Sequence, residues 1–245
     1  MFFPYKDDNP TDLTPTVTVG IIVANLLVWV FFQGAGSAHA LAYSTCQWGL
    51  TPGEILRSLP PGVSTPLGQG YACVTTGHPN YLTVFTSMFL HGSWFHILGN
   101  MWFLWIFGNN IEDAMGHTRY LVFYLLSGVA AAAAQTISAP HSAIPMIGAS
   151  GAISGVMGAY LLLFPRVKVH TLVFFVIFFT TITVPAYLML VWWFLLQFLG
   201  GLPALGGQGD TGGVAVFAHM GGFIAGLVLV KLFTKSRQTA RSLSR

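Results

Sequence analysis

The chain has 245 residues, of which 54% are hydrophobic and only 7% are charged, and its formal net charge is +3. A soluble globular domain carries about a quarter charged residues, so this composition excludes an ordinary soluble domain. It indicates a protein with several membrane spans, and the small positive charge gives no support for nucleic-acid binding.

Residues 1–15 are polar and predict a flexible cytoplasmic tail. Residues 16–233 predict an all-α polytopic membrane protein with a bundle of six transmembrane helices, because their apolar stretches approach the roughly 17–25 residues that a spanning helix needs. Pro185 lies inside the fifth stretch, and we expect it to kink or divide that stretch. The six stretches are Thr16–Phe32, Trp94–Phe107, Tyr120–Ile137, Ile147–Phe164, Thr171–Leu199 and Val214–Phe233.

Residues 33–84 form a long first loop on the external side, rich in Gly, Pro, Ser and Thr. Its length predicts an ordered, functional loop or one that lies in the membrane interface. Cys46 and Cys73 both fall in this loop. A disulfide in an oxidising compartment and two unpaired thiols both fit the sequence at this point.

The second stretch begins with a cluster of polar residues. Ser93 is placed to cap the helix, and His96 and Asn100 lie one turn apart on one helix face. His91 precedes them. Polar side chains inside a span are costly, so we expect this cluster to face the bundle interior and to serve a function. At the inner end of the same helix, Glu112 or Asp113 is predicted to pair with Arg119 or to cap the third helix.

The fourth stretch places a serine between small residues where a loop gives way to a helix. Ser150 lies between Gly148 and Gly151, and Gly155 and Gly158 extend a nearly bare helix face. A helix that starts near Ser150 directs its unpaired N–H groups and its positive dipole end at any negative charge formed there. Another helix can approach such a face closely.

The sixth stretch supplies a matching surface. His219 comes one turn before Gly222 and two turns before Gly226. Close packing of the two glycine-lined helices would bring a serine and a histidine together as nucleophile and base.

Peptide hydrolysis also needs donors for the oxyanion. The Asn100 amide, the His96 imidazole N–H and the Ser150 backbone N–H are predicted to lie on one level. No carboxylate is available at this depth to orient His219, so the sequence predicts a Ser–His dyad rather than a triad.

Other hydrolytic chemistries lack their residues. A zinc protease of the His-Glu-x-x-His type is excluded because no His-Glu pair occurs. A metal held by His91, His96 and His219 would have no acidic ligand or base nearby, so neither a metal nor a cofactor is expected. Gly207-Gln208-Gly209-Asp210 is similar to the Gly-x-Gly-Asp motif of intramembrane aspartyl proteases, but no second membrane-embedded aspartate accompanies it.

The basic residues predict the orientation. With both termini cytoplasmic, nine of the ten Lys and Arg residues lie on the inner side and only Arg57 lies outside, as the positive-inside bias requires. The basic tail at residues 234–245 is expected to contact anionic headgroups. These features predict a multi-pass protein of the cell membrane whose site opens to the external side.

Taken together, four motifs are similar to those of the rhomboid family of intramembrane serine proteases. They are Gly148-Ala149-Ser150-Gly151, the His91/His96/Asn100 cluster, the Gly108…Glu112…Gly116 run and Ala218-His219-x-Gly221-Gly222.

The resemblance implies a six-helix core with Ser150 as nucleophile, His219 as base, His96 and Asn100 at the oxyanion and His91 in support. It also implies single-span membrane proteins as substrates, cut near the outer face. Many members carry an aromatic residue four positions after the nucleophile, packed on the catalytic imidazole, whereas this chain has Ser154.

Two other functions are alternatives to an intramembrane serine endopeptidase. A catalytically inactive relative that binds or escorts membrane helices typically lacks the serine or the histidine, and both are present here. A transporter or channel would need a polar path on the inner side and an inverted repeat, and neither is visible. The oligomeric state is left open.

Overall fold

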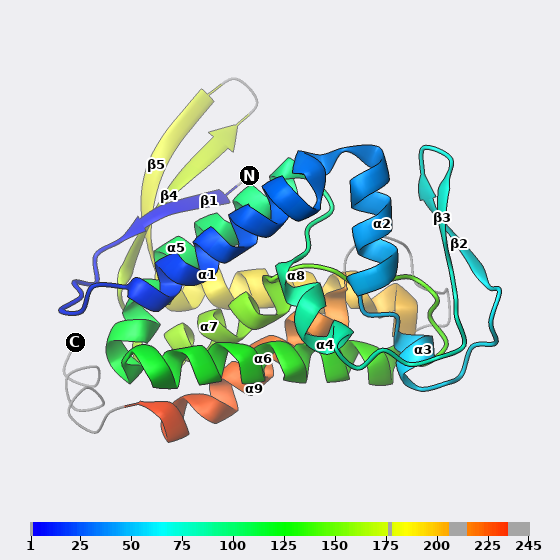
Figure 1. Ribbon diagram of the computed structural model, residues 1–245. Coiled ribbons are helices and arrows are strands. Elements are labelled where there is room, and N and C mark those ends of the chain that lie inside the picture. Colours follow the sequence, from blue (N-terminus) through cyan, green and yellow to red (C-terminus); the bar gives the residue numbers. More distant parts are fainter. Residues whose placement is uncertain (1, 176–177, 206–214, 235–245) are drawn as a thin grey trace.

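The computed structural model describes residues 2–175, 178–205 and 215–234, and most of them are helical (Figure 1). Among these residues, two helices, α6 (His117–Ser138) and α9 (Val216–Phe233), are long and apolar enough to cross a membrane by length and composition. Three shorter apolar helical segments are Thr16–Phe32, Ser150–Leu163 and Ala186–Gly200. The helices that overlap the six predicted stretches are α1 (Thr16–Leu27, continued by the π-helical turn η1, Val28–Phe32), α5 (Trp94–Met115), α6 (His117–Ser138), α7 (Ser150–Leu163), α8 (Ala186–Leu205) and α9 (Val216–Phe233).

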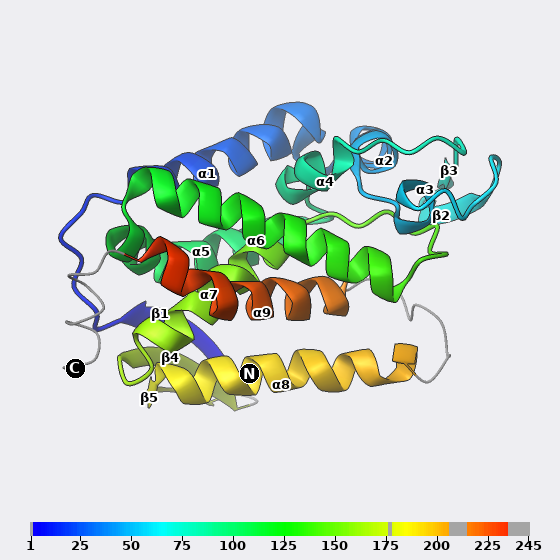
Figure 2. The same cartoon turned by 90° about the horizontal axis from the view of Figure 1, so that it is seen from below.

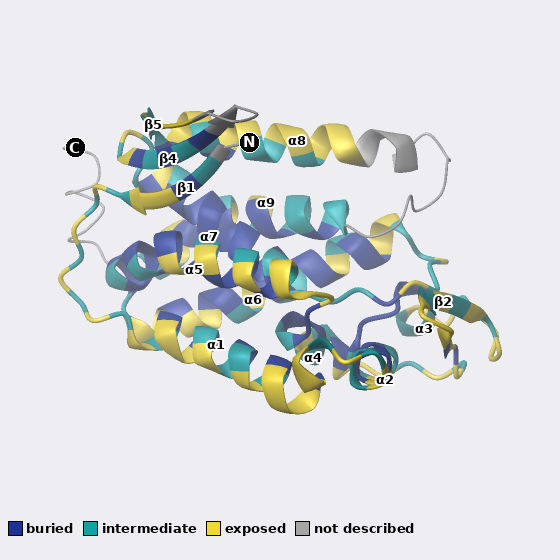
Figure 3. Cartoon of the chain, turned by 90° about the horizontal axis from the view of Figure 1, so that it is seen from above, coloured by how far each residue is buried: buried dark blue, intermediate teal, exposed yellow. Residues whose placement is uncertain are grey.

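Helix α7 lies at the centre of this bundle and packs against α5, α6, α8 and α9. It is buried along almost its whole length, whereas α8 runs along the edge of the bundle beside α9 with much of its surface exposed (Figures 2 and 3). Helices α5, α7 and α9 begin at the same end of the bundle, and α1, α6 and α8 run in the opposite direction (Figure 1). Three helix N-termini therefore converge at one end.

The contact between α7 and α9 is made by glycines. A Cβ at Gly222 would stand 2.0 Å from the carbonyl oxygen of Gly151, and a Cβ at Gly158 would stand 2.2 Å from that of Phe223. A Cβ at Gly155 would meet the Ser127 side chain of α6 at 2.4 Å. Any side chain at these positions would separate the helices, so glycine sets how closely α7, α6 and α9 approach.

A three-stranded antiparallel sheet corrects the all-α prediction. Its strands are β1 (Phe2–Asp7), β4 (Lys168–Phe175) and β5 (Phe178–Pro185), in the order β1-β4-β5. Residues 2–7 of the predicted flexible tail thus form a strand, with Phe3 opposite Leu172 and Lys6 opposite His170.

The fifth predicted stretch is divided at Pro185, which was one of the two expected outcomes. Its first part forms β4 and β5, because a run of Val, Thr, Ile and Phe suits a pleated sheet. Proline has no backbone N–H and is disfavoured inside a helix, so Pro185 ends β5 and α8 begins at the next residue, Ala186.

The 33–84 loop is ordered and contains its own elements. They are η2 (Gly34–Gly36), α2 (Ala38–Trp48), α3 (Pro52–Ile55), a hairpin of β2 (Ser64–Gly68) and β3 (Tyr71–Val74), and α4 (Thr83–Thr86), followed by η3 (Ser87–Phe89). Cys46 on α2 and Cys73 on β3 form a disulfide, which decides between the two alternatives left open by the sequence. The disulfide ties the hairpin to α2.

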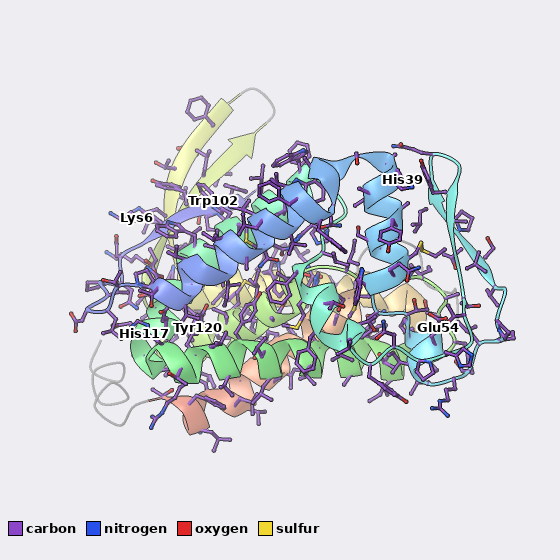
Figure 4. All side chains as sticks on the ribbon, in the orientation of Figure 1. Lys6, His39, Glu54, Trp102, His117 and Tyr120 are labelled. Carbon is purple, nitrogen blue, oxygen red and sulfur yellow. A yellow bond between two sulfur atoms is a disulfide. The ribbon has the colours of Figure 1, made fainter. Side chains whose placement is uncertain are left out.

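Glu112 at the far end of α5 caps α1 rather than the third predicted helix. Its fully buried carboxylate accepts hydrogen bonds from the backbone N–H groups of Val17 and Thr18, at 2.9 and 2.8 Å, and from the Thr18 hydroxyl. It also contacts His117 Nδ1 at 2.6 Å. Figure 4 shows His117 and Tyr120 at this end of the bundle, opposite the end that carries Glu54.

Candidate active site

Ser150 and His219 meet at the end of the bundle where the three helix N-termini converge. Ser150 is the first residue of α7, as the sequence predicts, and His219 lies in the first turn of α9. The Ser150 hydroxyl oxygen and His219 Nε2 lie within hydrogen-bond distance, 2.7 Å apart, across 69 residues of sequence. Close approach of Gly222 to the Gly151 carbonyl holds the two helices at the separation that this hydrogen bond requires.

The other ring nitrogen of His219 contacts a residue that the sequence interpretation missed. His219 Nδ1 lies 2.8 Å from Oε1 of Gln197 on α8. The ring of Trp193, one helical turn earlier on α8, packs against the imidazole with a centroid separation of 5.8 Å and an interplanar angle of 42°. A lone glutamine in an apolar run was the available signal, because polar residues inside a span are costly and usually functional.

Ser154 stands where an aromatic residue was expected to pack on the imidazole. It is buried, and its hydroxyl donates to the carbonyl oxygen of Ser150 at 2.6 Å. The aromatic contact to His219 is made instead by Trp193 from α8. The imidazole therefore has an aromatic neighbour, supplied by a different helix.

His96 lies beside the serine with its tautomer set by the backbone. Ser93 caps α5 as predicted, its hydroxyl accepting from the His96 N–H at 3.1 Å. The Gly92 N–H donates to His96 Nδ1 at 3.3 Å, so a neutral His96 carries its proton on Nε2. A Cβ at Gly148 would stand only 2.8 Å from that Nε2, and Gly148 has a φ of +131°. Glycine at 148 thus allows His96 to reach the site.

Asn100, one turn further along α5, presents an unused donor. It is buried, and its amide nitrogen has no hydrogen-bond partner among the described residues. Asn100, His96, Ser150 and His219 all line one cavity of about 580 Å³. An unpaired amide facing this cavity can donate to a negatively charged oxygen that forms there.

His91 lies behind His96 and does not line the cavity. Its ring is fully buried, packs edge-on against His96 at a centroid distance of 5.0 Å, and has no hydrogen-bond partner for either nitrogen within the described parts of the chain. Its backbone is clamped by Gln33, which accepts from the His91 N–H at 2.8 Å and donates to its carbonyl at 2.9 Å. This geometry fits a supporting position. Gln33 was also missed by the sequence interpretation.

The positive electrostatic potential expected in the cavity comes from helix dipoles and not from charged side chains. Its lining contains no Asp, Glu, Lys or Arg among residues 2–175, 178–205 and 215–234. The positive ends of α5, α7 and α9 face it, and the first N–H groups of α7 lack helical partners. Over the same residues, no group of three or more His, Cys, Asp or Glu side chains could hold a metal ion. The Gly207–Asp210 motif and most of the 234–245 tail lie outside the described residues.

Comparison with known proteins identifies a family. The family model of the Rhomboid domain matches residues 78–236. Over 77 residues the chain is 35% identical to Rhomboid-like protein 11, chloroplastic, of Arabidopsis thaliana, covering 31% of this chain and 27% of that protein. Over 97 residues it is 30% identical to Rhomboid protein 1, mitochondrial, of Saccharomyces cerevisiae, covering 38% and 28% of the two chains.

A third relative is bacterial. Over 76 residues the chain is 37% identical to Rhomboid protease GluP of Bacillus subtilis, covering 31% of this chain and 14% of that protein. The matches thus span less than a third of each of these three relatives. The domain match, by contrast, extends from the residues before α4 to the end of α9 and includes Ser150 and His219. The chain therefore belongs to the rhomboid family, whose members are embedded in membranes.

Proposed function

We propose that this chain is an intramembrane serine endopeptidase. The observation that carries the proposal is the 2.7 Å contact between the Ser150 hydroxyl and His219 Nε2, inside a cavity that also presents the donors of His96 and Asn100. A nucleophile in contact with a base, beside unpaired donors for an oxyanion, is the arrangement that acyl transfer requires.

The reaction follows from these contacts. His219 Nε2 takes the proton of Ser150 as its oxygen attacks the scissile carbonyl carbon, and the carbonyl oxygen becomes negative. His96 Nε2–H, the Asn100 amide and the Ser150 backbone N–H donate to that oxygen. The imidazolium then protonates the leaving amine as the C–N bond breaks. Water, with His219 again as base, hydrolyses the acyl-enzyme and restores Ser150.

We propose single-span membrane proteins as substrates, cut near the outer face of the cell membrane. The rhomboid family acts on membrane-protein substrates within the bilayer, and the cavity lies among the helices of the bundle. Two features support a site that opens outward with both termini cytoplasmic. Among the described residues, Arg119, Arg166, Lys168 and Lys231 lie at the opposite ends of α6, α7 and α9. The Cys46–Cys73 disulfide lies in the 33–84 loop, which is consistent with an oxidising side.

A fluorophosphonate probe tests the proposal on the full-length protein in detergent. We expect covalent labelling at Ser150, complete loss of labelling in Ser150→Ala, and strong loss in His219→Ala. Ser138→Ala, at the exposed end of α6, is the matched control and should label like the parent protein. A folded parent protein that never labels would favour the alternative function, a rhomboid-like protein that binds or escorts membrane helices without cleaving them.

A further inference from the structure

We infer that Gln197 of α8 is a positioning residue for His219: it fixes the tautomer of the imidazole through Nδ1. The inference rests on the proposed function and adds a third residue to the Ser150–His219 pair. The contact that carries it is the 2.8 Å separation between Gln197 Oε1 and His219 Nδ1.

The chemistry of the acceptor decides which nitrogen carries the proton. A carbonyl oxygen can only accept a hydrogen bond, so His219 Nδ1 must donate to Gln197 Oε1. In a neutral imidazole, Nε2 is then left with its lone pair, and this nitrogen faces the Ser150 hydroxyl at 2.7 Å. The opposite tautomer would place a proton on Nε2 and leave Ser150 without a base.

The same helix face restrains the ring from a second direction. Trp193 precedes Gln197 by one turn on α8, and its ring packs on the imidazole. Position 154 on α7 holds a serine, which has no aromatic surface to offer the His219 ring. Its hydroxyl donates to the Ser150 carbonyl oxygen. Helix α8 therefore supplies both the aromatic contact of the His219 ring and the polar contact at its Nδ1.

A glutamine differs from a carboxylate in this role. Its amide is neutral, so it orients the ring without adding a charge that would stabilise the imidazolium. Among residues 2–175, 178–205 and 215–234, His96 is the titratable group that faces His219 from the neighbouring helices.

Two substitutions separate the hydrogen bond from packing. Gln197→Met keeps the length of the side chain and removes the acceptor, and Gln197→Glu keeps an acceptor at the same place. With a fluorophosphonate probe, we expect Gln197→Met to lower the maximal labelling rate of Ser150 about 10- to 100-fold while the probe concentration for half-maximal rate changes less than about twofold. Leu196→Met, at the adjacent and more exposed position on α8, should label like the parent protein.

Gln197→Glu should restore most of the labelling rate. Because its carboxylate stabilises the imidazolium, the acid limb of the rate–pH profile should move to higher pH. If Gln197→Met and Gln197→Glu lower the labelling rate equally and the acid limb of the rate–pH profile does not move, Gln197 serves packing only. A labelling rate in Gln197→Met equal to that of the parent protein would also overturn the inference.

A second measurement does not depend on activity. The ¹⁵N chemical shifts of the His219 ring nitrogens distinguish the two neutral tautomers, and we expect the Nδ1–H form in the parent protein and a mixture in Gln197→Met. An Nε2–H ring in the parent protein would overturn the inference even if Ser150 labels. If the parent protein shows the Nδ1–H ring and Ser150 does not label, the proposed function fails while the positioning contact stands.

Discussion

Gly226 on α9 lies directly against the backbone of Gly155 on α7, where a Cβ added to Gly226 would stand 2.0 Å from the Gly155 carbonyl oxygen. A backbone carbonyl inside a helix cannot move aside as the end of a flexible side chain can. Gly226→Ala should therefore push α9 away from α7 and lower the free energy of unfolding by about 1–3 kcal/mol.

The same substitution should reduce fluorophosphonate labelling, because the separation of Ser150 and His219 is set by the α7–α9 contact. Thermal unfolding in detergent and the labelling rate measure the two effects. Gly20→Ala is the control, since a Cβ at Gly20 of α1 meets nothing within 4 Å. If Gly226→Ala and Gly20→Ala have the same free energy of unfolding, α7 and α9 can separate at little cost.

Asn100 is expected to act only on the charged intermediate. Its amide nitrogen has no partner in the described structure, so Asn100→Ala should leave the fold intact. Loss of one oxyanion donor should lower kcat for a cleaved membrane substrate about 100- to 1,000-fold with a small change in KM. Asn109→Ala, at the opposite end of the same helix, should leave kcat unchanged. A fall in affinity at constant kcat would instead assign Asn100 to substrate binding.

Asp7 should make stability depend on pH. Its carboxylate accepts from the Tyr160 hydroxyl at 2.5 Å and from the Asn110 amide at 2.7 Å, which ties β1 to α7 and α5. Burial raises the pKa of Asp7 from 3.8 to about 6 despite the hydrogen bond from Tyr160. The folded state therefore holds the proton more tightly than the unfolded state, and the resulting stabilisation is complete below about pH 4 and is lost as the pH rises to about 6.

Asp7→Asn should remove this pH dependence and raise the free energy of unfolding at pH 7 by about 1–2 kcal/mol, since it avoids a partly buried charge. Unfolding in detergent from pH 4 to 8 measures the effect. Asp8→Asn is the neighbouring comparison: the Asp8 side chain is 44% exposed and contacts His170 Nε2 at 2.8 Å, so this substitution should not raise stability at pH 7. A parent-like pH curve in Asp7→Asn would show that another group titrates in this range.

The Cys46–Cys73 disulfide should stabilise the 33–84 loop. It closes a sequence separation of 27 residues, for which chain entropy predicts a stabilisation of about 3–4 kcal/mol. The double variant Cys46→Ser, Cys73→Ser should make the β2–β3 hairpin sensitive to limited proteolysis while the α5–α9 bundle stays protected. Alkylation of the parent protein should add no label before reduction and two labels after it, and labelling of both thiols without reductant would contradict the bond.

Much of the candidate site could be predicted from local sequence. Ser150 opens a helix because a loop precedes it and small residues follow it, and Ser93 caps α5 because its hydroxyl can reach an N–H three residues on. The glycine spacing on α7 and α9 follows from helix geometry alone, and so does the common face of His96 and Asn100. In each case the partners are near neighbours along the chain.

The remaining features depend on partners that are distant in sequence. The run from Thr171 is apolar enough for a span, and periodicity alone does not distinguish a buried strand from a helix. It becomes a strand because β1, more than 160 residues earlier, supplies the backbone partners that a sheet needs.

Glu112 caps α1, and Gln197 contacts His219, although each pair of partners is distant in sequence. Tertiary packing decides which buried polar group lies within hydrogen-bond distance of which donor. The sequence by itself predicted Ser150 and His219 as the proposed nucleophile and base, and it determined the glycine-lined faces of α7 and α9. Only the tertiary structure determined how the His219 ring is oriented, because that orientation depends on α8, whose position is set by packing and by the sheet that precedes it.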